Sequence, residues 1–368
     1  MTKQIEADTL RQWLDEHRPV TVLDIRADQD RAQWAIPGSM HVNAYDALRS
    51  GQPGQLADAA FPLDRPIVTV CNAGRVSQAA AEFLAERGFD VRSLTGGMKA
   101  WSLAWNTARV PIKDDRITII QVRRTGKGCL SYIVISDGDA AVIDASLPLE
   151  VYEDIARSHG ARIRRVIETH IHADHLSRAR QLADRVGAQL LLPEQERVSF
   201  PFTAVQDGDE IAVGSARLLA RHTPGHTVES TSYVLTDNAV FTGDTLFTMG
   251  VGRPDLHADA AGARDRARAL FQSLQALRTL GSEVIVLPAH TSEPIAFDGR
   301  PVLSRMSSIE EWLGAWMGSE SSFVDRVVSR LPETPPNFGR IVDLNERGEM
   351  PDVDVTELEA GANRCAVS

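Results

Sequence analysis

The stretch Thr169-His170-Ile171-His172-Ala173-Asp174-His175 places three histidines and an aspartate within six residues, directly after the apolar pair Val166-Ile167. Three shorter runs follow it: His222-Thr223-Pro224-Gly225-His226-Thr227, Phe241-Thr242-Gly243-Asp244-Thr245 and Leu287-Pro288-Ala289-His290. Neutral imidazole and carboxylate are ligands that zinc and iron accept. A single histidine is usually an ordinary surface or core residue, but this clustering indicates a metal site. The His-x-His spacing fits a strand end or a loop, where side chains two apart share a face.

The length and composition predict a globular protein of two domains. A chain of 368 residues is too long for one core, and 43% hydrophobic with 24% charged residues excludes a disordered or fibrous class. The net charge of -11 argues against nucleic acid as a partner, because phosphate binding needs clustered Lys and Arg. We find neither a signal peptide nor about 18 consecutive apolar residues, so we expect no membrane partner.

The cysteine content indicates a reducing compartment. Only Cys71, Cys129 and Cys365 are present, an odd and widely spaced set that makes a disulfide framework improbable. We therefore expect a cytoplasmic protein. Cys129 is expected to serve packing, and Cys365 is expected to lie in a poorly ordered terminal segment.

The N-terminal part alternates short apolar runs with a helical pattern. Residues 21–25, 67–70 and 91–94 are rich in strand formers, and residues 76–87 repeat apolar side chains with a helical period. Strand, helix and strand at this spacing indicate parallel pairing. We expect an α/β domain over residues 1–105.

The rest of the chain predicts a linker, a second domain and an extension. Residues 106–115 contain Pro111 and no usable period, which is typical of a linker. The second domain is expected over residues 116–335, and the C-terminal extension over 336–368 has no predicted core. The second domain opens with three predicted strands, the last two joined by a turn at Asp137-Gly138-Asp139: residues 117–122, 130–136 and 140–143. Helices and strands follow, which favours an α+β class.

Cys71 lies between a predicted strand and a predicted helix. Backbone N–H groups of such a loop and the positive end of the helix dipole stabilise an anion, so we expect Cys71 to be a nucleophilic thiolate. Arg75, four residues later, would add to this effect and help bind an anionic donor. The alternative is that Cys71 is a small buried apolar residue, the commoner situation for a single cysteine.

Four ordered stretches resemble a rhodanese domain: Val22-Leu23-Asp24-Ile25-Arg26, Ile36-Pro37-Gly38-Ser39, the Cys71 loop and Gly96-Gly97-Met98-Lys99-Ala100-Trp101. The resemblance implies a parallel-sheet domain in which Cys71 accepts a sulfane sulfur and passes it to a thiol such as glutathione, with thiosulfate as a donor. Many rhodaneses carry the loop arginine one place later, where Val76 stands. Asp24 and Arg26 are expected to form a structural ion pair.

The histidine runs resemble the metallo-β-lactamase fold, an αββα sandwich with its site at a loop edge. If every ligand is used, the resemblance implies a hydrolytic site with two metals. The first metal takes His170, His172 and His222, the second takes Asp174, His175 and His290, and Asp244 bridges them. If only His170, His222 and Asp244 bind, two histidines and one carboxylate form the facial triad of non-haem Fe(II) oxygenases.

Two further stretches resemble the persulfide dioxygenases, mono-iron members of this fold: 168–175 and Gly250-Val251-Gly252-Arg253-Pro254-Asp255. The resemblance implies one Fe(II) per chain and oxidation of glutathione persulfide to sulfite and glutathione. It also implies that Arg253 helps to seat glutathione. Val251 and Pro254 depart from the pattern, in which Cys and Thr are frequent.

Two other functions stay open. The first is a thioesterase resembling hydroxyacylglutathione hydrolase, with zinc, one ion or two, in place of iron. A residue matching His226 also occurs in such thioesterases, so it does not discriminate between the two enzymes. The second is a non-enzymatic module that binds or senses sulfur compounds. A homo-oligomer is compatible with each function.

Overall fold

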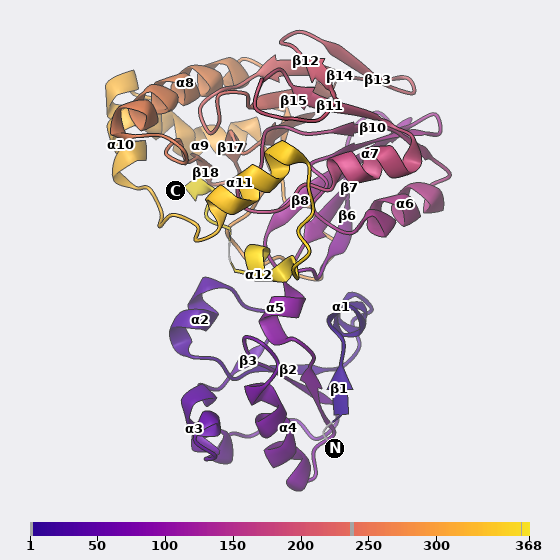
Figure 1. Ribbon diagram of the computed structural model, residues 1–368, viewed down its shortest axis with the longest axis vertical. Helices are drawn as coiled ribbons and strands as arrows, with labels where there is room; N and C mark the ends of the chain where they lie inside the picture. The colour runs from indigo at the N-terminus through magenta and orange to yellow at the C-terminus, as the bar shows by residue number, and fades with distance from the viewer. Residues whose placement is uncertain (1–2, 236–238, 362) are drawn as a thin grey trace.

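The computed structural model describes residues 3–235, 239–361 and 363–368. Figure 1 shows two bodies joined near α5 and α12 (Gly97–Trp101 and Thr356–Glu359), with the N-terminal domain below and the larger domain above. Among the described residues, no helix is both long and apolar enough to cross a membrane.

The N-terminal domain is built on a five-stranded sheet in the order β1-β5-β4-β2-β3, all of whose pairs are parallel. Its strands are β1 (Lys3–Ile5), β2 (Thr21–Asp24), β3 (Met40–His41), β4 (Ile67–Val70) and β5 (Val91–Leu94). Helices α1 (Ala7–Asp15), α2 (Asp28–Gln33), α3 (Tyr45–Arg49) and α4 (Val76–Glu86) accompany α5, with a short 3-10 turn at Gly54–Ala57. All four residues of β4 are buried, as parallel strands covered on both faces require. The predicted βαβ unit is confirmed.

The second domain packs two sheets face to face. The first has the order β12-β11-β10-β9-β8-β7-β6, and the second has the order β13-β14-β15-β16-β19-β20. The first sheet contains β6 (Asn106–Val110), β7 (Ile117–Arg124), β8 (Cys129–Ser136), β9 (Asp139–Ile143), β10 (Arg162–Ile167), β11 (Gln189–Pro193) and β12 (Thr203–Val205). The second contains β13 (Glu210–Val213), β14 (Ala216–His222), β15 (Thr231–Leu235), β16 (Ala239–Gly243), β19 (Ile285–Pro288) and β20 (Ser304–Arg305).

Helices cover the outer face of each sheet. Side chains of α6 (Leu149–Ser158) and α7 (Ala179–Val186) join the apolar cluster of the first sheet, and those of α8 (Ala260–Arg278), α9 (Met306–Trp316) and α10 (Glu320–Ser329) join that of the second. Between the sheets lies a third cluster, in which the rings of Tyr132 and Phe241 stack edge to face. This αββα sandwich confirms the predicted fold class.

The predicted linker is wrong over residues 106–110. These residues form β6, which pairs antiparallel with β7 from Asn106 opposite Arg123 to Val110 opposite Ile119. Alternating burial of the five side chains explains why the segment showed no helical period: it is a half-buried edge strand.

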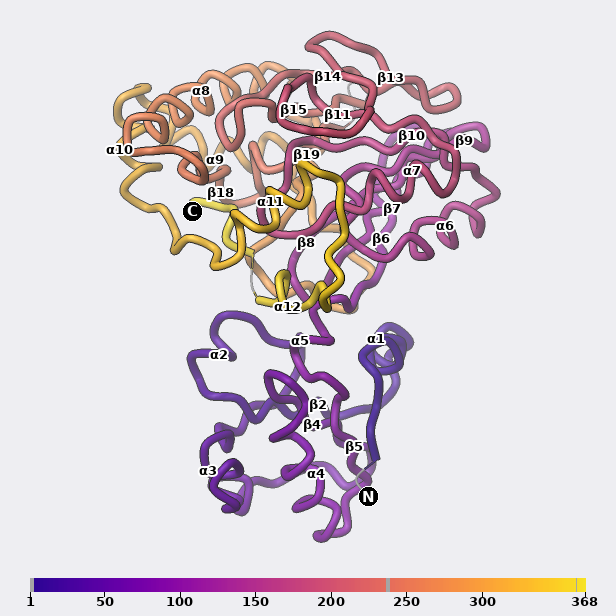
Figure 2. The backbone as a smooth tube through the Cα atoms, viewed as in Figure 1, coloured from indigo at the N-terminus to yellow at the C-terminus, as the bar shows by residue number. Residues whose placement is uncertain are grey.

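The C-terminal segment packs against the second domain. After α11 (Phe338–Arg347) and α12, the strand β21 (Ala366–Val367) pairs with β18 (Gly250–Gly252), which in turn pairs with β17 (Leu246–Phe247). Figure 2 shows this yellow segment crossing the face of the domain. Cys365 is consequently buried, so the expectation of a poorly ordered terminal segment is wrong at this residue.

Close backbone contacts fix the junction between the domains. Trp34 Nε1 donates to Thr125 O at 3.2 Å, and Arg124 Nε donates to Ser102 O at 2.7 Å. A Cβ added to Gly126 would lie 1.8 Å from Trp101 O. The turn after β7 therefore fits the N-terminal domain only with glycine at position 126.

We expect Gly126→Ala to lower the free energy of unfolding by about 1–3 kcal/mol, the usual cost of overpacking, because backbone atoms of Trp101 stand in the way. Urea unfolding measures this change. Gly339→Ala is the matched control, since a Cβ there meets nothing within 4 Å and α11 favours alanine. Equal stability of the two variants would contradict the tight junction.

Candidate metal centre

The histidine and aspartate side chains meet at one edge of the sandwich. Residues 170–175 follow β10, His226 lies in the loop after β14, Asp244 follows β16 directly, and His290 follows β19. The histidines and aspartates among these residues are buried, with at most 4% of each residue exposed. The loops that follow four different strands thus bring their polar side chains together in one region shielded from solvent.

His170, His226 and Asp244 form the first half of the centre. His170 Nε2 and His226 Nε2 lie 3.8 and 3.6 Å from Asp244 Oδ2. Within the described part of the chain, none of these three buried atoms has a hydrogen-bond partner. Unpaired buried donors and acceptors are costly, and these three converge on one point. Two imidazoles and a carboxylate therefore fit a metal ion, and they leave further coordination positions to non-protein ligands.

Hydrogen bonds behind the ligands fix their orientation. Thr169 Oγ1 donates to Asp144 Oδ2 at 2.9 Å and lies 2.9 Å from His170 Nδ1, from which it accepts. His226 Nδ1 donates to Arg253 O at 2.8 Å. Both rings therefore carry their proton on Nδ1 and present Nε2 as the free ligand atom, the arrangement that metal-binding histidines require.

The charge states suit metal binding. Burial, followed by the neighbouring His172, lowers the pKa of His170 well below its ordinary value, and burial also lowers the pKa of His226. Burial opposes ionisation of Asp244, but His290, His170 and His226 outweigh it and hold the pKa of Asp244 below its ordinary value. Two neutral imidazoles and one carboxylate result.

The structure contradicts His222 as a ligand. His222 is the last residue of β14, is exposed, and its Nε2 donates to Val228 O at 2.8 Å. His226, four residues later, occupies the place predicted for it. The signal was present in the sequence: Pro224-Gly225 turns the chain back after the strand, and Gly225 packs so closely on Leu270 that a Cβ would lie 2.4 Å away. Such a turn carries the following residue back over the sheet edge.

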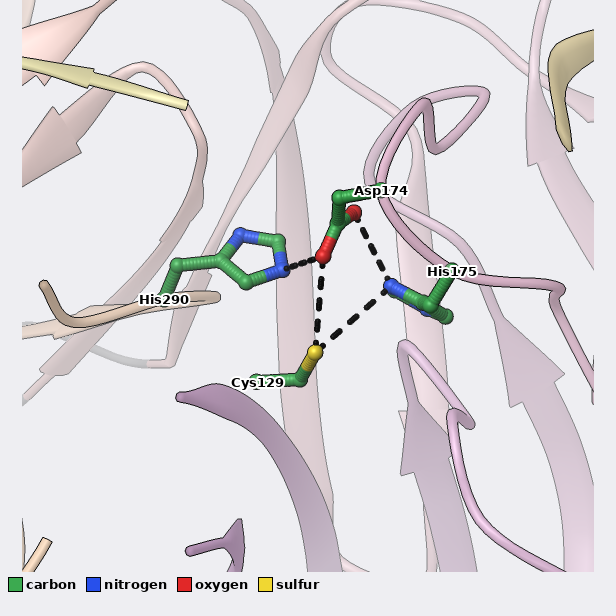
Figure 3. A group of neighbouring side chains, drawn as sticks. All are labelled: Cys129, Asp174, His175 and His290. Carbon is green, nitrogen blue, oxygen red and sulfur yellow. Dashed lines mark hydrogen bonds and ion pairs between the residues drawn. The ribbon is translucent and has the colours of Figure 1, made fainter. Parts of the chain in front are cut away.

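Cys129, Asp174, His175 and His290 form the second half of the centre (Figure 3). Their ligand atoms all lie within 4.8 Å of one another. His172 stands apart, since its Nε2 contacts Glu168 Oε2 at 2.7 Å and Asp144 Oδ1 at 3.4 Å.

Cys129 and Cys365 are the residues that sequence reasoning missed. Burial and Asp174 raise the pKa of the Cys129 thiol, but His175 and His290 outweigh them and lower it to about 7. Cys365 lies with Asp244 and His290 in a further cluster. No spacing rule identifies either cysteine, because each joins the histidines only through folding.

The Cys71 loop has the predicted form. Ser77 N donates to Cys71 Sγ at 3.4 Å, and Sγ lies 3.3 Å from Ser77 Oγ, so the start of α4 points an amide at the sulfur. Arg75 is exposed. Asn72 and Ala73 help to line a cavity of about 350 Å³ at the domain junction, whose other wall includes Gly126 and Glu357.

The ion pair expected in the N-terminal domain is present. Arg26 Nη2 lies 2.6 Å from Asp24 Oδ2, and both side chains are buried.

The structure contradicts Arg253 as a glutathione ligand: its side chain is fully buried and all five of its N–H donors are used. Two go to Asp255, and three go to backbone carbonyls in the C-terminal segment: Pro332, Glu333 and Arg364.

A second cavity, of about 320 Å³, borders the metal centre at His290. Its walls include His290, Asn363, Phe247 and the exposed Met249 and Glu293. This volume is within the range of ligand pockets, and His290 places it beside the metal ligands.

Comparison with known proteins agrees with the two folds. Residues 6–104 match the rhodanese-like domain and residues 124–290 match the metallo-beta-lactamase superfamily. A probable metallo-hydrolase of Burkholderia pseudomallei is 30% identical over 207 residues, 45% of this chain and 69% of that protein. A hydroxyacylglutathione hydrolase of Brucella anthropi is 35% identical over 155 residues, 41% of this chain and about half (53%) of that protein.

Among solved structures, ETHE1 from Myxococcus xanthus superposes with a TM-score of 0.54 at 26% identity, covering 64% of this chain and 98% of that one. The chain belongs to the metallo-beta-lactamase superfamily and carries a rhodanese-like domain in its N-terminal part.

Proposed function

We propose that the second domain oxidises the persulfide of a small thiol, with glutathione persulfide as the substrate, and that Cys71 transfers sulfane sulfur. The observation that carries the proposal is the set of three unpartnered donor atoms of His170, His226 and Asp244, which matches a two-histidine, one-carboxylate triad. The likeness to ETHE1 supports it.

The side chains around the triad determine how a persulfide would be bound and shielded from water. An Fe(II) ion bound by the triad would supply the redox chemistry with O₂. His170 and His226 stay neutral and are fixed by Thr169 and the backbone of Arg253, so they need no rearrangement to bind. The cavity beside His290 admits the thiol, while burial of the ligands excludes bulk water. The overall reaction balances as RSSH + O₂ + H₂O → RSH + SO₃²⁻ + 2H⁺.

The sulfur-transfer step uses Cys71. A thiolate acceptor attacks the outer sulfur of a Cys71 persulfide, the old S–S bond breaks, and its electron pair stays on Cys71, so no external oxidant is needed. The amide of Ser77 faces the sulfur and stabilises the negative charge that returns to it.

The second candidate is a di-zinc thioesterase, which the similarity to hydroxyacylglutathione hydrolases favours. Three contacts argue against it. His172 is engaged by Glu168 and Asp144, and Asp244 Oδ1 contacts His290 Nδ1 at 2.5 Å. Asp244 therefore has only Oδ2 free to bind a metal ion, and this oxygen faces the triad.

The test is O₂ uptake by anaerobically purified, iron-loaded protein given glutathione persulfide. We expect one sulfite for each O₂ consumed. Cys71→Ser should keep this activity and lose transfer from thiosulfate to a thiol, because the nucleophile is absent but the metal centre is intact. Absence of O₂ uptake together with hydrolysis of S-lactoylglutathione by zinc-loaded protein would reject the proposal in favour of the thioesterase.

A further inference from the structure

We propose that the cavity at the domain junction binds the small thiol that accepts sulfur from Cys71, and that the second domain completes this site with Glu357 of α12. The ligand is of the class of zwitterionic thiols, which carry an ammonium and a carboxylate, as glutathione does. This inference rests on the proposed sulfur transfer by Cys71, and it adds where the acceptor binds and which side chains recognise it.

The cavity lies beside the loop of the nucleophile. Its volume of about 350 Å³ is within the range of ligand pockets. Asn72 and Ala73, which directly follow Cys71, line one wall. Met98 and Lys99 of α5 line it too, and both are bonded to the loop: Met98 N donates to Cys71 O at 2.8 Å, and Lys99 N donates to Asn72 O at 3.0 Å. A ligand in the cavity therefore lies next to the loop that carries the sulfur.

The second domain forms the opposite wall with Thr356 and Glu357. Figure 1 shows α12 next to α5 at the junction of the two bodies. Buried contacts of Glu359 hold this short helix in place. Lys127 Nζ donates to Glu359 O at 2.8 Å, and Arg124 Nη2 lies 2.7 Å from Glu359 Oε2. The wall that faces the Cys71 loop is thus fixed by the core of the other domain.

Both signs of charge are present on the walls. Among the described residues, the charged side chains that line the cavity are Arg26, Asp30, Lys99 and Glu357. Asp24 neutralises Arg26 through the ion pair at 2.6 Å. Asp30 Oδ2 accepts from Asn72 Nδ2 at 2.9 Å, and this uncharged donor leaves the negative charge of Asp30 in place. One ammonium and two carboxylates therefore remain, which favours a zwitterion over a simple anion.

The pair between Lys99 and Glu357 can exchange partners with such a ligand. Lys99 Nζ contacts Glu357 Oε1 and lies 3.8 Å from Asp354 Oδ2. The Glu357 and Asp354 side chains are 61% and 59% exposed, so water screens these pairs and they contribute little to stability. On binding, a carboxylate of the ligand accepts from Lys99, and its ammonium donates to Glu357 and Asp30.

Binding next to the loop serves the transfer step. Only 1% of Cys71 is exposed, so an acceptor must be held against its loop to react. The thiolate of the acceptor attacks the outer sulfur of the Cys71 persulfide, and that sulfur moves to the acceptor. The S–S bond to Cys71 breaks, and its electron pair returns to Cys71.

Steady-state transfer from thiosulfate by the full chain tests the proposal with different acceptors. Glutathione is a zwitterion, 3-mercaptopropionate has a carboxylate but no ammonium, and cyanide has neither. All of these reactions share the step with thiosulfate, so comparing acceptors isolates the acceptor site. We expect Glu357→Gln to lower kcat/KM for glutathione about 5–10-fold relative to the other two acceptors, between the effects of an exposed ion pair and of a charged hydrogen bond. Lys99→Gln should lower kcat/KM for both thiols by a similar factor relative to cyanide.

Variants of surface ion pairs outside the cavity are the matched controls. Lys3 pairs with Asp90, and Glu333 pairs with Arg364. Lys3→Gln and Glu333→Gln should keep the wild-type preference for glutathione. Circular dichroism confirms that each variant folds.

The acceptor site and the transfer reaction fail in different ways. An unchanged preference for glutathione in Glu357→Gln, or equal losses with every acceptor, would overturn the site while transfer by Cys71 stands. A wild type that transfers no sulfur even to cyanide would refute the transfer by Cys71, and the acceptor site with it.

Discussion

Replacing His226 with alanine is expected to lower metal binding at the triad, and turnover with it, by more than about 100-fold, since loss of an outer-shell partner alone costs roughly 10–100-fold. His226 supplies one of three converging protein donors, and its Nε2 lies 3.6 Å from Asp244 Oδ2. Alanine leaves two ligands and a gap. Iron content after dialysis and the initial rate of O₂ uptake measure the effect.

His222→Ala is the control for this experiment. His222 belongs to the same run of sequence, but it is exposed and contacts the carbonyl of Val228. We expect unchanged iron content and rate. If His222→Ala were the inactive variant and His226→Ala the active one, the geometry of the triad would be wrong.

Replacing Glu359 with glutamine is expected to lower the free energy of unfolding by roughly 3–5 kcal/mol, the cost of leaving a buried charge without its partner. Glu359 and Arg124 are both fully buried, and Arg124 Nη2 lies 2.7 Å from Glu359 Oε2. Glu359 Oε1 also accepts from Leu176 N at 2.8 Å, and Arg178 lies 3.4 Å from the same oxygen. Glutamine retains the size but removes the charge.

Glu150→Gln is the matched control. Glu150 pairs with Arg185 at 2.6 Å, but both side chains are about half exposed. Water screens such a pair, which contributes about 0–1 kcal/mol. Urea unfolding of both variants should therefore separate them clearly. Similar losses would show that the buried network contributes little.

The same network predicts a pH dependence. Burial raises the pKa of Glu359, but Arg124 and Arg178 outweigh it, so the pKa in the folded protein is lower than the ordinary value of 4.5. A depressed carboxyl pKa stabilises the fold above the ordinary value, and this contribution is lost as the pH falls through the folded pKa. The wild type should lose more stability than Glu359→Gln below about pH 4.5.

Local patterns predicted much of the fold. Strands β4 and β5 and the start of α4 lie where the apolar runs placed them. The hairpin between β8 and β9 turns at Asp137 and Gly138, both with positive φ, as an Asp-Gly pair favours. These features depend on residues close together in sequence, which is why a single sequence sufficed.

The failures concern contacts between distant segments. His222 and His226 share one run, and only the direction of the turn decides which faces Asp244. Arg253 was expected to contact glutathione, but backbone carbonyls about 80 to 110 residues later in the chain accept three of its five N–H donors. Cys129 gains its neighbours through the pairing of β8 with the loop of His290. The contacts of Arg253 and Cys129 have no local signature, whereas the Pro224-Gly225 turn before His226 is one.

The pairing of β6 with β7 determines how the two domains can be exchanged between proteins. Dividing the chain at residue 116 would remove β6 from the second domain. The long and almost wholly buried β7 would then become an exposed edge strand of its sheet. Exposed edge strands of this kind pair with strands of other chains and so promote aggregation. Gene rearrangements that shuffle these domains should therefore break before Asn106, and hybrids joined after Val110 should precipitate.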